Sequence, residues 1–276
     1  MIASIKAEWR KSRLRPAFLI SAGIMAGITI LVYGVNWYLA LHPLSTRGGD
    51  RAVVNFATLY PDQFVNNVMG AAFPIGAAIA IVLGALFAGS EYGWGTVKTM
   101  FTQGPGRLTV WAGRLVVFAA WMLIMTIVLF AVGAASSVVV ALFQGHAISW
   151  PAAIDLAKGI GAIWLVLMVN GSIGLALGTL IKQSAAALGV GLTYVLAVEV
   201  LAVRIINLIN NGQFKNVTEQ FVNQNATALT QSFTSPAFGR VTAPVVTAEH
   251  AVLVLVLYGV GLAVVAAGLL RLRDVT

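Results

Sequence analysis

The chain has 276 residues, of which 59% are hydrophobic and only 9% are Asp, Glu, Lys or Arg. Soluble domains carry about a quarter charged residues, so this composition excludes an ordinary soluble globular protein and predicts an integral membrane protein. The absence of cysteine excludes disulfides, thiolate metal sites and cysteine nucleophiles. A formal charge of +8 would suggest nucleic-acid binding in a soluble protein, but in a membrane protein its meaning depends on where the basic residues lie.

The N-terminal segment predicts an amphipathic elbow helix that lies in the headgroup layer. Ile2, Ile5 and Trp9 share one helical face, and Arg10 with the other basic residues occupies the remainder. Pro16 is expected to separate this helix from the first span. The apolar run that follows is longer than the core of a signal peptide, so we interpret it as an uncleaved span. A plain positively charged anchor is the alternative interpretation of the segment.

Six apolar stretches follow, each long enough to cross a hydrocarbon core of about 30 Å as a helix. None alternates in polarity as the strands of a membrane barrel do. We therefore expect an all-α integral membrane protein, with the elbow at residues 1–16 and a single six-helix transmembrane domain at residues 17–276. The expected spans are Ala17–Leu41, Val65–Ala88, Trp111–Phe143, Leu156–Ile181, Ala185–Leu208 and His250–Leu270.

The distribution of basic residues predicts the topology. With a cytoplasmic N-terminus, eleven of the 17 Lys and Arg residues fall on cytoplasmic segments, which then hold the whole net charge. The positive-inside rule thus predicts that both termini are cytoplasmic. The basic character indicates orientation in the plasma membrane, and we expect lipid contact but no nucleic-acid partner. An external segment at about residues 209–249 is polar, and Phe214, Val217 and Phe221, with Val222 as a further member, predict a short helix on the outer surface.

A cytoplasmic loop at about residues 89–110 separates the second and third spans. Its predicted short helix has an apolar face formed by Val97, Met100 and Phe101. Glu91 is expected to cap or pair at the start of this helix, and Gly104-Pro-Gly106 to end it. A helix presented in this way suits docking into a groove on a cytoplasmic partner. A plain re-entry turn is the alternative.

The loop resembles the coupling loop of permease subunits from type-2 ATP-binding-cassette (ABC) exporters. The shared pattern is Glu-Tyr-x-x-Gly-Thr-x-Lys, then Gly-x-x-Arg and a basic residue that enters the next span. The matching residues are Glu91, Tyr92, Gly95, Thr96, Lys98, Gly104 and Arg107, with Arg114 where the family often has Lys. The layout of elbow, six spans, loop and external segment is similar across the whole chain.

The resemblance implies a transport subunit from a prokaryotic cell membrane. Two permease copies, most simply a homodimer although a heterodimer stays open, would form the export path, and each would dock a cytoplasmic ATPase through the loop. The chain has no phosphate-binding Gly-x-x-x-x-Gly-Lys-Ser/Thr motif. ATP and magnesium are therefore expected in the partner, with no cofactor or enzyme activity in this chain. The expected substrate is a lipophilic or amphipathic drug, peptide or lipid, and charge reversal at Glu91 or Arg107 is expected to uncouple ATP hydrolysis from transport.

Two further residues are candidates for the transport path. Glu199 is the only acidic residue well inside an expected span. A charged side chain at that depth is energetically costly and therefore indicates a functional role. It could line the path or hold a cation, or serve only as a structural partner. Pro74 is expected to kink the second span. Small residues four apart, which permit close helix contact, are the pairs Gly23/Gly27 and Gly174/Gly178.

Other function classes have weaker support. A secondary transporter driven by an ion gradient would favour inverted repeats and several buried ionisable groups, and a membrane scaffold or sensor is a further alternative. His42, His146 and His250 are far apart and form no zinc motif, so no metal site is expected. An intramembrane hydrolase would need a nucleophile, and no nucleophile elbow is present.

Overall fold

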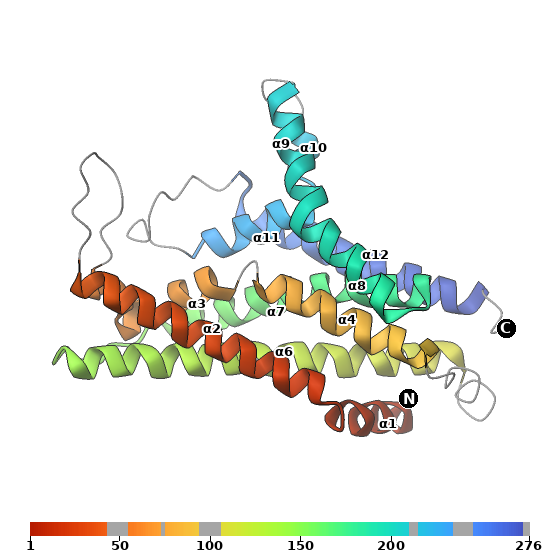
Figure 1. Cartoon of the computed structure of the whole chain (residues 1–276), viewed down its shortest axis with the longest axis horizontal. Coiled ribbons are helices and arrows are strands. Elements are labelled where there is room, and N and C mark those ends of the chain that lie inside the picture. Colours follow the sequence, from red (N-terminus) through yellow and green to blue (C-terminus); the bar gives the residue numbers. More distant parts are fainter. Residues whose placement is uncertain (43–54, 73–74, 94–105, 210–214, 234–244, 273–276) are drawn as a thin grey trace.

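The computed structural model of the chain describes residues 1–42, 55–72, 75–93, 106–209, 215–233 and 245–272. The regular structure in this part of the chain is helical throughout (Figure 1). In chain order, the elements are α1 (Ile2–Arg13), α2 (Pro16–Leu41), η1 (Phe56–Leu59), η2 (Pro61–Gln63), α3 (Phe64–Ala72), α4 (Ile75–Gly93), α6 (Arg107–Phe143), α7 (Ala153–Ile181), α8 (Ser184–Thr193), η3 (Tyr194–Val198), α9 (Glu199–Ile209), α10 (Lys215–Thr218), α11 (Val222–Gln231) and α12 (Ala248–Leu272).

Five helical stretches in the described residues are long and apolar enough to cross a membrane. These are α2, α6, α7, the continuous run α8–η3–α9, and α12. A sixth crossing is formed if α3 and α4, which are bent by 57° around residues 73–74, count as one broken span. The chain is therefore an all-α, multi-pass membrane protein. Pro74 lies outside the described residues, and the bend that it was predicted to cause separates the helices that flank it.

The N-terminus and the last turn of α12 lie at one end of the helix bundle, together with the end of α4 and the start of α6 (Figure 1). We call this end of the bundle the α1 end.

The bundle is organised around α7. In its most apolar stretch, 67% of the residues are buried, against 17% for the peripheral α12. Glycines let α7 and α4 approach until their backbones touch. A Cβ atom at Gly174 would lie 2.2 Å from the carbonyl oxygen of Ile81, and one at Gly84 would lie 2.1 Å from that of Gly171. The small-residue spacing at Gly174 thus packs two helices of the same chain.

The fifth span divides at η3, a π-helical turn. Before this turn α8 packs against α4 and α7, whereas beyond it α9 leaves the bundle (Figure 1). A π-helical turn inserts an extra residue and redirects the helix that follows. The predicted span Ala185–Leu208 is therefore one continuous helical run, and its two halves have different surroundings.

The described residues of the external segment form the short helix α10, in which Val217 is exposed, and the longer helix α11. Phe221 ends a turn and precedes α11, whose Val222, Ala226 and Leu229 are buried in the main core. The helix packs mainly against α12 and also touches α3 and α7. The helix that enters the core therefore begins at Val222, and Phe214 lies outside the described residues.

Candidate functional site

Four charged side chains meet where α1, α4 and α6 join. Glu91 of α4 forms close ion pairs with Lys11 of α1 and with Arg114 of α6. Glu8 of α1 lies 3.1 Å from the Lys11 ammonium and 3.9 Å from the Arg114 guanidinium. We call these four residues the junction cluster. Two acids and two bases from three helices balance one another in charge.

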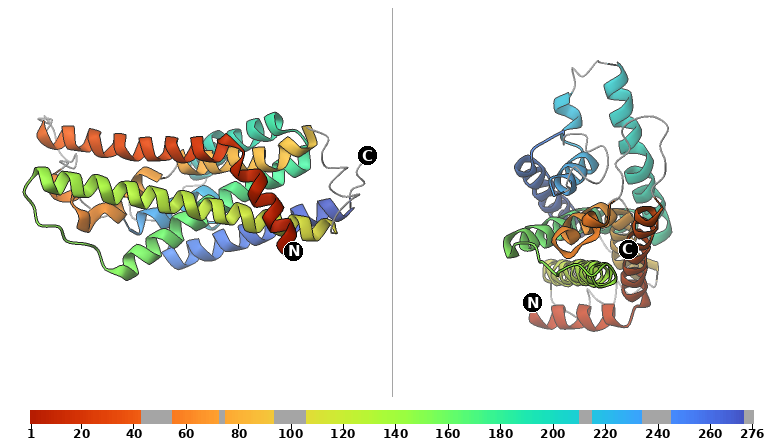
Figure 2. Two further views of the ribbon diagram at one scale, coloured as in Figure 1. Left: turned by 90° about the horizontal axis from the view of Figure 1, so that it is seen from below. Right: turned by 90° about the vertical axis from the view of Figure 1, so that its left-hand side faces the viewer.

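The polar face of α1 is what packs against the bundle. Figure 2 shows α1 crossing α6 at a steep angle near the start of α6. Ser4, Glu8 and Ser12, spaced four apart, are buried on this face. Gly113 of α6 permits the contact, because a Cβ atom there would lie 2.7 Å from the Ser4 hydroxyl oxygen. A face of small polar residues can approach this closely and still place Glu8 against Arg114.

Only part of the predicted apolar face of the elbow packs against the bundle. Ile5 and Trp9 pack against the core, whereas Ile2 is 72% exposed. Trp9 stacks on Trp121 of α6 at a centroid distance of 5.3 Å. The face predicted for Ile2, Ile5 and Trp9 is therefore divided, because the helix is rotated to bury its serines and Glu8 and leaves Ile2 exposed.

Aromatic and hydrogen-bond contacts also hold α1 against α2 and α6. Trp121 also stacks on Phe18 of α2, with centroids 4.8 Å apart. Its indole N–H donates to the Ser12 hydroxyl oxygen at 2.8 Å, and that hydroxyl donates to the Trp9 carbonyl at 2.9 Å. The buried indole is thus satisfied by α1 itself, which ties the elbow helix to the first and third spans.

Burial changes the proton affinity of the basic groups at the joint. Desolvation lowers the pKa of the Lys11 ammonium to about 8, against the opposing attraction of the Glu8 carboxylate. Burial likewise lowers the pKa of the Arg15 guanidinium, which leads from α1 into α2. Lys11 therefore stays protonated near neutral pH, and the carboxylates offset much of the cost of burying the cations.

The structure corrects the expected position of Glu91. The sequence placed Glu91 at the start of a docking helix, but it lies in the last turn of α4 and is 2% exposed. The connection between spans is also shorter than predicted, because α4 continues to Gly93 and α6 begins at Arg107. Tyr92 is in the last turn of α4. The other motif residues, Gly95, Thr96, Lys98, Met100, Phe101 and Gly104, lie outside the described residues.

Glu8 and Lys11 of the junction cluster were missed at the level of sequence. A signal was present, because Glu8 is the single acid in a segment with five bases. A carboxylate at that position, with serines four residues before and after it, marks the face that turns inward.

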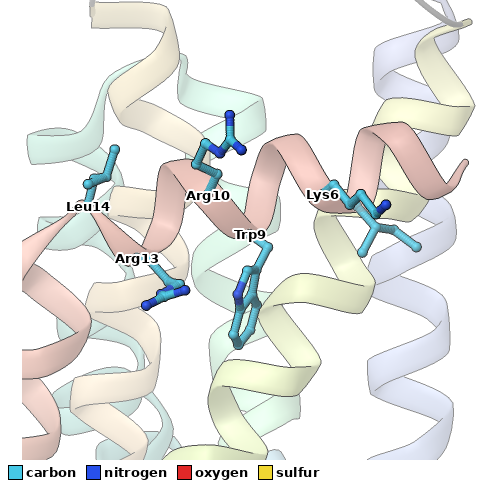
Figure 3. Close-up of a pocket in the computed structure, with 6 residues that line it drawn as sticks. Lys6, Trp9, Arg10, Arg13 and Leu14 are labelled. Atoms are coloured by element: carbon cyan, nitrogen blue, oxygen red, sulfur yellow. The ribbon is translucent and has the colours of Figure 1, made fainter.

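The opposite face of α1 is basic and exposed. Lys6, Arg10 and Arg13 line a groove of about 560 Å³ together with Ile5, Trp9 and Leu14. Figure 3 shows Arg10 and Leu14 on one side of the helix and Trp9 on the other. Basic side chains beside exposed apolar ones are the composition of a helix that rests on a lipid surface.

Glu199 lies away from the junction cluster, directly after η3. It is 1% exposed, and its Oε1 atom accepts a hydrogen bond from the backbone N–H of Asn223 at the start of α11. Within the described residues, no group of three or more His, Asp or Glu side chains is arranged to hold a metal ion.

A family model described as "Protein of unknown function (DUF2705)" matches residues 46–276. The chain belongs to this family. The DUF2705 match includes Glu91, Arg114 and Glu199, whereas Glu8 and Lys11 of the junction cluster precede the matched residues. A comparison with curated proteins finds no match. Membership in DUF2705 names no activity.

Proposed function

We propose that the chain is the permease subunit of an ABC exporter for a lipophilic or amphipathic substrate. ATP hydrolysis in a separate ATPase subunit, docked on the connection between α4 and α6, powers the transport. The observation that carries the proposal is the Glu-Tyr-x-x-Gly-Thr-x-Lys pattern, whose Glu91 is buried in an ion pair with Arg114, the basic residue after the loop. A second permease copy and a second ATPase complete the transporter.

The junction cluster supports a mechanical role for this connection. Glu91 is two residues from the end of α4, and Arg114 lies two turns into α6. Lys11 joins both to α1 through Glu91. Because the charges are paired away from water, the three helices resist separation. A force applied to the connection therefore moves α1, α4 and α6 together.

The proposal predicts a specific contact at Met100, and the chain offers a clean background for its test because it has no cysteine. A Met100→Cys variant should form a crosslink to the ATPase subunit in the reconstituted complex, with a yield that changes on ATP binding. An Asp62→Cys variant is the matched control, since Asp62 lies in η2 directly before α3, and α3 lies toward the other end of the bundle from α1 (Figure 1).

The coupling is tested by transport and ATPase measurements on the same complex. An Arg107→Glu variant should keep its fold and lose substrate-stimulated ATP hydrolysis. Charge reversal at Glu91 is no longer a test of docking, because it would place a third cation beside Lys11 and Arg114.

Uptake or export driven by an ion gradient in vesicles that hold this chain alone would overturn the proposal in favour of a secondary transporter. A purified native assembly with no nucleotide-binding subunit would favour a scaffold or sensor.

A further inference from the structure

The divergence of α9 and α11 leaves a pocket of about 370 Å³ beside the fifth span. We call it the fork pocket. Its lining residues are Val195, Leu196, Glu199, Val200, Val203, Arg204, Asn223, Gln224 and Thr227. Four of these are aliphatic, and Glu199 supplies the one carboxylate among them.

The polar side of the fork pocket is built from two elements that hold each other. Phe221, the residue before α11, has no capping side chain. The Glu199 Oε1 atom caps this helix instead, by accepting from the Asn223 N–H. In return, the Asn223 side-chain amide donates to the Val195 carbonyl oxygen in η3 at 2.8 Å. The π-helical turn and the start of α11 are therefore locked together around the carboxylate.

Two buried acceptors face this side of the pocket, the Glu199 carboxylate and Asn223 Oδ1. The carboxylate accepts from the backbone N–H of Asn223, and the Tyr194 hydroxyl and the Gln224 backbone N–H lie beside it as further donors, whereas Asn223 Oδ1 is buried without a donor within the described residues. An ionised carboxylate offers about four acceptor sites, so three neighbouring donors leave room for a further N–H group. Its negative charge favours a ligand that brings this N–H group on a cation.

The surroundings define the rest of the ligand. Leu196, Val200 and Val203 offer a hydrocarbon wall, and Leu196 and Val200 are exposed toward the outside of the bundle. Arg204 lies at the pocket and is exposed, so its charge is in contact with the surroundings. A bare divalent metal ion does not fit, because one carboxylate and one amide oxygen are fewer ligands than calcium or magnesium requires.

We propose that the fork pocket binds the primary ammonium group of an amphipathic amine, with Glu199 and Asn223 accepting its N–H groups and the aliphatic wall taking its hydrocarbon chain. The ammonium can belong to an aminophospholipid or to a free long-chain amine. This binding site does not rest on the proposed transport function, because it needs neither an ATPase nor a second copy.

The test uses the full chain purified in detergent, with native mass spectrometry as the readout of bound ligand. Dodecylamine is compared with dodecyltrimethylammonium, which has the same chain and charge but no N–H donor. Wild-type protein should bind dodecylamine at least about tenfold more tightly, as expected for charge-assisted hydrogen bonds to a buried carboxylate. Short-chain phosphatidylethanolamine and phosphatidylcholine form the second pair and report whether a lipid headgroup is accepted.

Two variants make the test specific to the pocket. Glu199→Gln keeps an acceptor for the α11 cap but removes the charge, and should weaken dodecylamine binding by about tenfold. Glu249→Gln, an exposed acid at the start of α12, should leave it unchanged. Leu196→Trp narrows the pocket without changing the Glu199 cap of α11. It should weaken the binding of both ligands that carry a primary ammonium, dodecylamine and phosphatidylethanolamine.

Equal affinity for the amine and its trimethyl analogue would overturn the proposal, as would wild-type binding in both the Glu199→Gln and Leu196→Trp proteins. Preference for phosphatidylethanolamine over phosphatidylcholine identifies a lipid as a source of the ammonium. Preference for dodecylamine alone restricts the site to free amines. Either preference supports the ammonium site, and neither depends on the outcome of the ATPase crosslinking.

Discussion

The α1 end and the fork pocket handle buried charge in different ways. In the junction cluster, two carboxylates and two cations from three helices satisfy one another. At the fork pocket, no cation pairs with the Glu199 carboxylate among the described ion pairs, and its neighbours are the backbone N–H groups at the start of α11 and the Tyr194 hydroxyl, all neutral donors. Mutually paired charges hold helices together, whereas a carboxylate with spare capacity can take a ligand. The junction cluster therefore holds three helices together, whereas the fork pocket offers a ligand-binding site.

Removal of Glu91 should have the largest effect. Glu91→Ala deprives both Arg114 and Lys11 of a close carboxylate, and Arg114 is only 5% exposed. We expect a loss of about 3–5 kcal/mol in the free energy of unfolding, the usual result of breaking a buried ion pair from one side. Thermal or denaturant unfolding of the purified chain in detergent measures the loss.

A matched control and a rescue sharpen this result. Glu249→Ala removes an exposed acid and should change stability by less than about 0.5 kcal/mol. Replacing both partners, as in Glu91→Leu with Arg114→Leu, should recover part of the loss because no buried charge is left behind. Equal stability of Glu91→Ala and wild type would show that the cluster is not the joint between these helices.

Ser12→Ala should have an intermediate effect on the same joint. The substitution removes the acceptor of the Trp121 indole N–H, which is buried between α1 and α6. An unsatisfied buried donor costs about 1–3 kcal/mol. Trp121→Phe in the Ser12→Ala background removes the donor as well, so the two substitutions should cost less together than the sum of each alone. Strictly additive costs in this double-mutant cycle would contradict the pairing.

The sequence predicts the membrane crossings well because the length of an apolar stretch can be read from that stretch alone, without knowledge of its neighbours in the fold. The starts and ends of α2, α7 and α12 fall within a few residues of expectation. The inward face of α1 could not be predicted in this way. Glu8 pairs with Arg114 of α6 and Lys11 pairs with Glu91 of α4, and a local pattern contains no information about residues that lie 80 or more positions away.

The same reasoning explains what was missed at Glu199. Its burial depth was evident from its place in an apolar run, and it was recognised as a candidate. Its partner Asn223 was not, since it comes from a polar segment 24 residues later. The turn at η3 also has no distinctive composition, because the sequence from Tyr194 to Val198 reads as an ordinary apolar helix.

Glu199→Gln should have a smaller effect on stability than either change at the joint. The glutamine keeps an acceptor for α11 but loses the attraction between a carboxylate and the positive end of the helix, a loss of about 1 kcal/mol. Hydrogen exchange of the α11 amides should become about fivefold faster, with no change in α7. Unchanged protection of α11 would mean that the carboxylate does not act as its cap.

The smallest effect on folding is expected on the exposed outer face of α1, which contrasts with its buried inner face. Simultaneous Lys6→Gln, Arg10→Gln and Arg13→Gln substitutions remove exposed charges, so the free energy of unfolding in neutral detergent should change by less than about 0.5 kcal/mol.

In bilayers, each basic residue near an anionic surface contributes about 1 kcal/mol of attraction. Wild-type protein should therefore gain thermal stability in nanodiscs when phosphatidylglycerol replaces phosphatidylcholine, and the triple variant should lose that gain. A gain that persists in the variant would place the lipid contact elsewhere and would leave the groove on α1 without a role in membrane binding.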